Sequence, residues 1–201
     1  KYLEKHRSGE KFPMNDVDYF GRYSMTKEIL TNRYYPKIDF VASFMEPRTF
    51  YTNHGWPHVE DIIFYVGELI GLNRDTYELE SNSLSPYEIY VLLMSILVHD
   101  VGMVYGRVGH ASKSFVVLQE IAPVVGNDAF EIKIISKVAE AHSGKLDGNK
   151  DTISELELCH TTMGCTVNVK CLSSLVRIAD EISETKRRAS RFDVDASVIT
   201  L

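Results

Sequence analysis

Cysteine is scarce in this sequence, and its spacing excludes the structures that cysteines usually build. The three cysteines, Cys159, Cys165 and Cys171, are odd in number and form no CxxC pair. A disulfide framework and a zinc ribbon both need paired or closely spaced cysteines, so the sequence supports neither. We therefore expect a reducing compartment, the cytoplasm.

Long apolar runs and an excess of positive charge are also missing. No stretch approaches 18 uncharged apolar residues, so we predict no membrane-spanning helix. The start at Lys1 has no signal-peptide pattern. The net charge is −6, which argues against a broad basic surface for nucleic acid but leaves a local basic groove open.

What the chain does have is the size and composition of a globular domain. Its 201 residues can bury a full hydrophobic core, and 44% of them are hydrophobic. Residues 1–50 predict an N-terminal extension of short helices and loops that packs on a core, and residues 51–201 predict the main domain. Because the chain lacks an initiator Met and ends on an apolar run, we interpret it as a piece of a longer protein with further domains.

The clearest secondary-structure signals are helical. Apolar residues recur every three or four positions after Pro57, which predicts an amphipathic helix. Ser85, Pro86 and Glu88 have the pattern of a capped helix start, and that helix should run to His99.

Later helices are expected after His110, after a cap at Asn127, and from about Val167 to Ile182. No run alternates long enough to argue for a sheet. The fold class predicted is therefore all-α, a helical bundle of five or more helices.

A metal site is the chemistry that the sequence favours. His99 and Asp100 directly follow the apolar stretch Ile96–Val98, where two buried polar groups need a partner. A metal ion would supply that partner, because imidazole nitrogen and carboxylate oxygen together suit divalent first-row metals.

The order of these residues resembles the HD superfamily of metal-dependent phosphohydrolases, over about residues 51–188. That family has a His early in one helix, a His-Asp pair after an apolar helix, and a distant Asp on a later helix. Here these positions are His58, the pair His99-Asp100, and Asp180 in the segment Val176-Arg177-Ile178-Ala179-Asp180. The resemblance implies an HD-type bundle whose metal is held by His58, His99, Asp100 and Asp180.

Members of that superfamily with two metals carry extra histidines between the pair and the last Asp. His110 and His142 lie in this interval, so the resemblance suggests a second ion held by them, with Asp100 bridging. One or two divalent ions are expected, with Mn, Fe, Ni, Co and Mg as candidates. Adjacent histidines and a Gly-Tyr-Pro motif are absent, which argues against the cyclic-dinucleotide-degrading branch.

Further groups could act on the substrate itself. His54 could donate to a phosphate or act as a general acid, since it lies four residues before His58. Positive charge stabilises phosphate oxygens in the transition state. Arg107 and Lys113 are favoured over Lys145 and Arg177 for this role, because they flank His110. The expected catalytic residues are Asp100, His54, Arg107 and Lys113.

Three functions follow from this interpretation. The leading hypothesis is hydrolysis of a phosphoester in a nucleotide or a related small phosphate, by a water that the metal activates. The second is a nuclease for single-stranded nucleic acid, and the third is a regulatory module that binds a ligand without turnover. The expected partner is a small phosphorylated substrate, with nucleic acid as the less favoured alternative. No membrane is expected, and the oligomeric state stays open.

Overall fold

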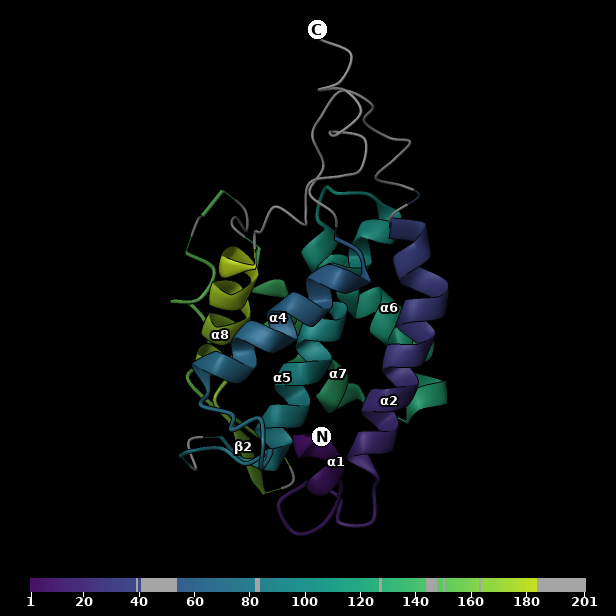
Figure 1. The fold of residues 1–201 in the computed structure, drawn as a ribbon. Coiled ribbons are helices and arrows are strands. Elements are labelled where there is room, and N and C mark those ends of the chain that lie inside the picture. The colour runs from purple at the N-terminus through teal and green to yellow at the C-terminus, as the bar shows by residue number, and fades with distance from the viewer. Residues whose placement is uncertain are drawn as a thin grey trace, which may run out of the picture.

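The computed structural model describes residues 1–38, 40, 54–81, 84–126, 128–143, 148–149, 151–162 and 164–183. These residues form a helical bundle (Figure 1), so the all-α prediction is confirmed. The only sheet among them is the antiparallel hairpin β1–β2, in which Thr161 pairs with Thr166. The elements are α1 (Tyr2–Lys5), α2 (Tyr19–Ile29), the π-helical turn η1 (Leu30–Tyr34), α4 (Trp56–Leu69), α5 (Pro86–Val98), the 3-10 turn η2 (Val101–Tyr105), α6 (His110–Val125), α7 (Ala129–Glu140), β1 (His160–Thr162), β2 (Cys165–Val167) and α8 (Val169–Ile182).

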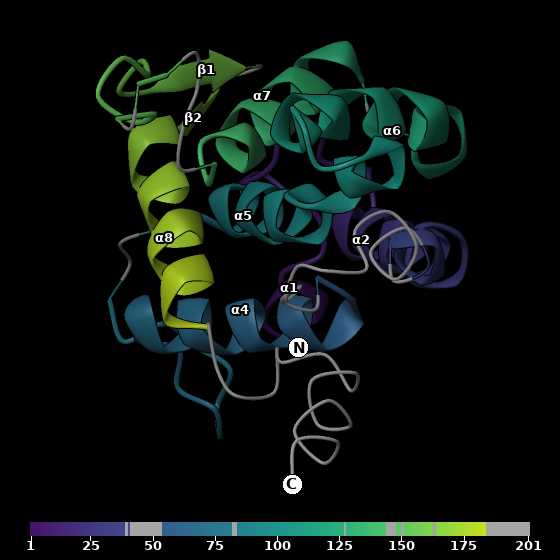
Figure 2. The same ribbon diagram turned by 90° about the horizontal axis from the view of Figure 1, so that it is seen from above.

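Helix α5 is the centre of the bundle. Figure 2 shows α4 on one side of α5 and α6 with α7 on the other, while α8 and α2 lie at the two flanks. Nearly every α5 side chain is buried, including Tyr87, Tyr90, Met94 and Leu97. A helix that is apolar on all faces has to be enclosed by other elements, which is why the remaining helices surround this one.

The burial of α5 also explains why such a long apolar stretch occurs here. Within the described residues, Pro86–Tyr105 is the one helical stretch long and apolar enough to cross a membrane, with a mean hydropathy of 1.5. However, 83% of that stretch is buried inside the fold, as expected of a core helix.

The starts of α5 and α7 show which side chains cap these helices. The predicted capping box at Ser85 and Glu88 is present, with each side chain bound to the other residue's backbone N–H. The start of α7 differs from the prediction. Asp128 is its N-cap and accepts hydrogen bonds from the N–H groups of Phe130 and Glu131, whereas the predicted cap, Asn127, is outside the described residues.

The N-terminal segment shares the core of the bundle. Tyr19 of α2 stacks on Phe12 and meets Tyr87 and Tyr90 edge-on. Arg22, also on α2, donates to the buried carboxylate of Glu131 on α7 at 2.7 Å. A buried carboxylate is costly without a partner, so Arg22 ties α2 to α7.

Candidate metal centre

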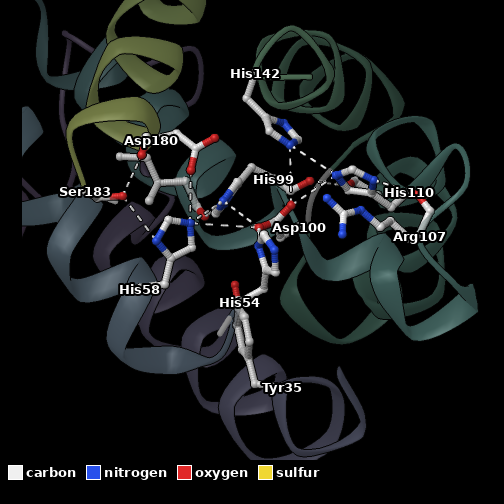
Figure 3. Close-up of polar contacts among 12 residues, drawn as sticks. Tyr35, His54, His58, His99, Asp100, Arg107, His110, His142, Asp180 and Ser183 are labelled. Carbon is white, nitrogen blue, oxygen red and sulfur yellow. Dashed lines mark hydrogen bonds and ion pairs between the residues drawn. The ribbon is translucent and has the colours of Figure 1, made fainter. Parts of the chain in front are cut away.

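Several helix ends converge at one end of the bundle and bring histidines and aspartates together (Figure 3). His58 lies in the first turn of α4 and Asp180 in the last turn of α8. The pair His99-Asp100 follows α5, His110 begins α6, and His142 comes just after α7. All six metal ligands suggested by the resemblance are therefore neighbours, although they come from five helices.

Asp100 is the centre of this cluster, and each of its two oxygens faces a different pair of histidines. Oδ2 lies 3.2 Å from His99 Nε2 and 3.9 Å from His58 Nε2. Oδ1 lies 3.1 Å from His110 Nε2 and 3.4 Å from His142 Nε2. Asp180 completes the first side, since its Oδ1 is 3.0 Å from His58 Nε2. We call these the His58 side (His58, His99, Asp180) and the His110 side (His110, His142), with Asp100 shared by both.

Hydrogen bonds on the other ring nitrogen, Nδ1, determine which nitrogen of each histidine can bind a metal. A backbone carbonyl has no proton, so a ring nitrogen that bonds to it must be the donor, and the neutral ring then has its lone pair on Nε2. This applies to three of the histidines. Nδ1 of His99 donates to the carbonyl of Ile96, that of His110 to Arg107, and that of His142 to Ala139.

His58 reaches the same state through a serine. Its Nδ1 is 3.2 Å from the Ser183 hydroxyl oxygen. That hydroxyl donates its own proton to the carbonyl of Asp180 at 2.7 Å, so it accepts from His58. All four histidines therefore direct an Nε2 lone pair toward Asp100 when they are neutral. Histidines that ligate metals are usually held by such a bond on their other nitrogen.

The spacing of these nitrogens fits a metal ion on each side. The Nε2 atoms of His58 and His99 are 3.4 Å apart, and those of His110 and His142 are 3.3 Å apart. Neutral nitrogens whose lone pairs face one another repel at this distance unless a cation lies between them. Nitrogen ligands bind such ions at about 2.1 Å, which places two of them about 3.4 Å apart at a tetrahedral angle. The buried His and Asp groups can thus bind a divalent metal ion.

The charges of the cluster depend on one another. Burial raises the pKa of Asp100, but the positive charges of His99 and His54 outweigh it and hold that pKa well below its usual range. Burial lowers the pKa of His99, yet the Asp100 carboxylate overrides this and raises it to about 9. Without a metal, protons on the histidines therefore balance the carboxylate, and a divalent ion would replace them.

The residues expected to act on substrate differ in their contacts with the cluster. His54 Nδ1 is 2.5 Å from Asp100 Oδ2, so His54 belongs to the cluster. The Arg107 side chain is exposed and points toward the Asp100–His110 part of the cluster in Figure 3. Lys113 has another contact: its ammonium donates to the backbone carbonyls of Tyr105 and Val108, and so holds the loop that leads to His110.

Of the two less favoured cations, Arg177 and Lys145, the structure describes only Arg177. Arg177 donates to the Thr152 hydroxyl at 2.9 Å, and Thr152 donates to the carbonyl of Ala141, directly before His142. Lys145 lies outside the described residues.

Gly102 has a role in the site that sequence reasoning missed. A Cβ atom at this position would lie 2.0 Å from the carbonyl oxygen of His110 and 2.9 Å from the Cβ of Lys113. Only glycine allows η2 and the start of α6 to approach so closely, and this contact helps to place His110. The glycine two residues after Asp100 was the available signal, but its neighbour could not be known from the sequence.

Comparison with known proteins identifies a family for this region. The family model described as HD-CE matches residues 48–200. The matched range includes every residue of the cluster, while α1, α2 and η1 precede it. Searches of curated proteins and of solved structures gave no match.

Proposed function

Because the chain belongs to the HD-CE family, an HD-like family, we propose that it is a metal-dependent hydrolase of a phosphoester in a nucleotide or a related small phosphate. One observation carries this proposal: the Asp100 carboxylate directs one oxygen to each of two histidine pairs. A carboxylate in this position can be shared by two cations. Two-metal sites of this kind suit displacement at phosphorus.

The ligands follow from the two sides of the cluster. His58, His99 and Asp180 would hold one ion, His110 and His142 would hold the other, and Asp100 would bridge them. When bound, such an ion lowers the pKa of a water and polarises a phosphoryl oxygen. The protein's own contribution is to direct each Nε2 inward through the bonds on Nδ1 described above, so that the nitrogen can bind an ion once it has lost its proton.

Two further residues are proposed to act on the substrate. Asp100 accepts from His54 Nδ1 and so orients the ring, and His54 would act as the general acid toward the leaving oxygen. Arg107, exposed at the edge of the His110 side, would balance the charge of the phosphate oxygens. Lys113 would contribute by holding the loop between them rather than by contacting phosphate.

The test is a hydrolysis screen with Mn²⁺, Ni²⁺, Co²⁺ and Mg²⁺ on nucleotides, cyclic nucleotides and single-stranded oligonucleotides. We expect metal-dependent release of phosphate or nucleoside from a small phosphoester, abolished by a chelator and by His99→Ala. Cleavage of oligonucleotides alone would identify a nuclease instead. Tight metal binding with no turnover of any substrate would favour a regulatory module.

Two variants distinguish the role of Arg107 from that of Lys113. Arg107→Gln should raise KM by about tenfold, since it removes a charge near the phosphate. Lys113→Gln should change the metal-free melting temperature more than KM, because its ammonium binds backbone carbonyls. Equal KM values for the parent and Arg107→Gln would contradict the role of Arg107.

A further inference from the structure

The family match begins at residue 48, yet two tyrosines before it contact the segments that carry the metal centre. We propose that Tyr35 and Tyr34 are positioning residues: Tyr35 fixes the end of α5 that carries His99 and Asp100, and Tyr34 fixes the loop that leads to His110. This inference rests on the proposed metal centre. It assigns to the N-terminal segment a part in building that centre.

Tyr35 acts at the C-terminus of α5. The last carbonyls of a helix have no partner inside the helix, and here they are buried away from water. The carbonyl of Ile96 is taken by the His99 ring and that of His99 by the Ser114 hydroxyl. The carbonyl of Leu97 accepts from the Tyr35 hydroxyl at 2.9 Å. Tyr35 therefore supplies one of three side-chain hydrogen bonds that hold the backbone at the metal-binding pair.

The surroundings of Tyr35 keep its hydroxyl a donor and link it to a second ligand helix. Burial, with the nearby charge of Asp100, raises the pKa of Tyr35 well above its usual range, so the hydroxyl keeps its proton. The ring meets Trp56 edge-on at 5.9 Å between centroids, and Trp56 begins α4 two residues before His58. Figure 3 shows the Tyr35 hydroxyl directed toward the cluster. One side chain thus contacts two of the helix ends that present ligands.

Tyr34 acts on the other side through a shared carboxylate. Its hydroxyl donates to one oxygen of Glu120 on α6 at 2.8 Å, and the hydroxyl of Tyr105 donates to the other oxygen, also at 2.8 Å. Tyr105 ends η2, directly before the loop that contains Arg107 and leads to His110. Glu120 therefore clamps this loop to the N-terminal segment.

The experiment compares Tyr35→Phe and Tyr34→Phe with a matched control, Tyr19→Phe. The control removes an equally buried hydroxyl of the same segment, but in the aromatic cluster around Tyr87. Binding of Mn²⁺ and the metal-free melting temperature are measured for each protein. We expect Tyr35→Phe to weaken binding by about tenfold, the usual loss when a group that supports a ligand is removed. Tyr34→Phe should weaken only the second ion, and Tyr19→Phe should leave both affinities at the parent value.

A merely structural role would lower the melting temperature of Tyr35→Phe without a selective loss of metal affinity, and this result would overturn the inference. Tyr19→Phe removes a hydroxyl without a hydrogen-bond partner among the described residues, so it shows the effect of losing a buried hydroxyl alone. The absorption spectrum of bound Co²⁺ gives a second readout, which should change in Tyr35→Phe and not in the control.

If Tyr35→Phe does not fold, Tyr34→Phe and Glu120→Gln decide the question, because they alter an exposed contact. Unchanged affinity for the second ion in both would then overturn the inference. A parent protein that binds no Mn²⁺ would contradict the proposed function as well.

Discussion

The two sides of Asp100 offer similar ligands but are built differently. On the His58 side, the side chains of His58 and His99 are 1% and 0% exposed, and Asp180 is the accessible ligand, at 21%. On the His110 side, His110 is 19% exposed and begins a helix after a loop. His142, on the same side as His110, is 4% exposed. The difference therefore lies in the histidines: both are enclosed on the His58 side, whereas one of the two is accessible on the His110 side, where substrate would approach.

The largest effect is expected from the enclosed side. His99→Ala should abolish tight binding of Mn²⁺, because a site with so few ligands loses most of its affinity with one of them. Isothermal titration with Mn²⁺ measures this, and circular dichroism of the metal-free variant checks that the helices are intact. Binding equal to that of the parent would show that the His58 side is not the principal metal site.

The double variant His110→Ala, His142→Ala tests whether the other side holds an ion of its own. We expect the stoichiometry to fall from two ions to one and most hydrolytic activity to be lost, while the remaining ion binds with nearly the parent affinity. Metal analysis after gel filtration gives the count. An unchanged count together with retained activity would leave a single ion on the His58 side.

The variant Gly102→Ala tests the difference between the two sides of Asp100 without removing a metal ligand. The added methyl group collides with the His110 carbonyl, and relief of such a clash costs about 1–3 kcal/mol. The second ion should bind more weakly, and the first should be nearly unaffected. Gly67→Ala is the control, because its Cβ would be 3.6 Å from the nearest atom, a side-chain carbon of Leu72, an ordinary contact. Equal loss at both ions would mean that Gly102 supports the whole cluster.

The smallest expected effect, taken over one pH unit, is the dependence of metal affinity on pH. The pKa of His99 is raised to about 9, so below that pH the metal-free site holds a proton that a metal must displace. Apparent metal affinity should therefore rise by about tenfold per pH unit from pH 6 to pH 8, for one proton released. Titrations in buffers of different ionisation enthalpy measure the release. Affinity that is flat or falls with rising pH would contradict the assigned protonation.

Local patterns in the sequence predicted the helices well. The Ser85 capping box and the apolar repeat after Pro57 correctly gave the helices that carry His99 and His58. These signals depend on residues within one or two helical turns, so they can be recognised without knowledge of the tertiary structure. The resemblance to HD proteins is likewise supported at the level of an HD-like family.

Contacts between distant segments could not be predicted. The hydrogen bond from His58 to Ser183 spans 125 positions, and the hydroxyl of Tyr35 donates to a carbonyl 62 positions later. Even a contact of short separation was not evident from the sequence, since the Lys113 ammonium donates to two carbonyls of the preceding loop. A sequence pattern shows which residue types are available, whereas the fold decides which groups they meet.

The Arg22–Glu131 ion pair has a practical consequence for anyone who shortens this protein. A chain cut at the start of the family match, residue 48, would lose Arg22 and leave the Glu131 carboxylate in the core without its cation. It would also uncover Tyr87 and Tyr90, which creates an apolar patch of the kind that causes aggregation. The boundary suited to expression and crystallisation therefore lies before α2, well upstream of the boundary that family comparison gives.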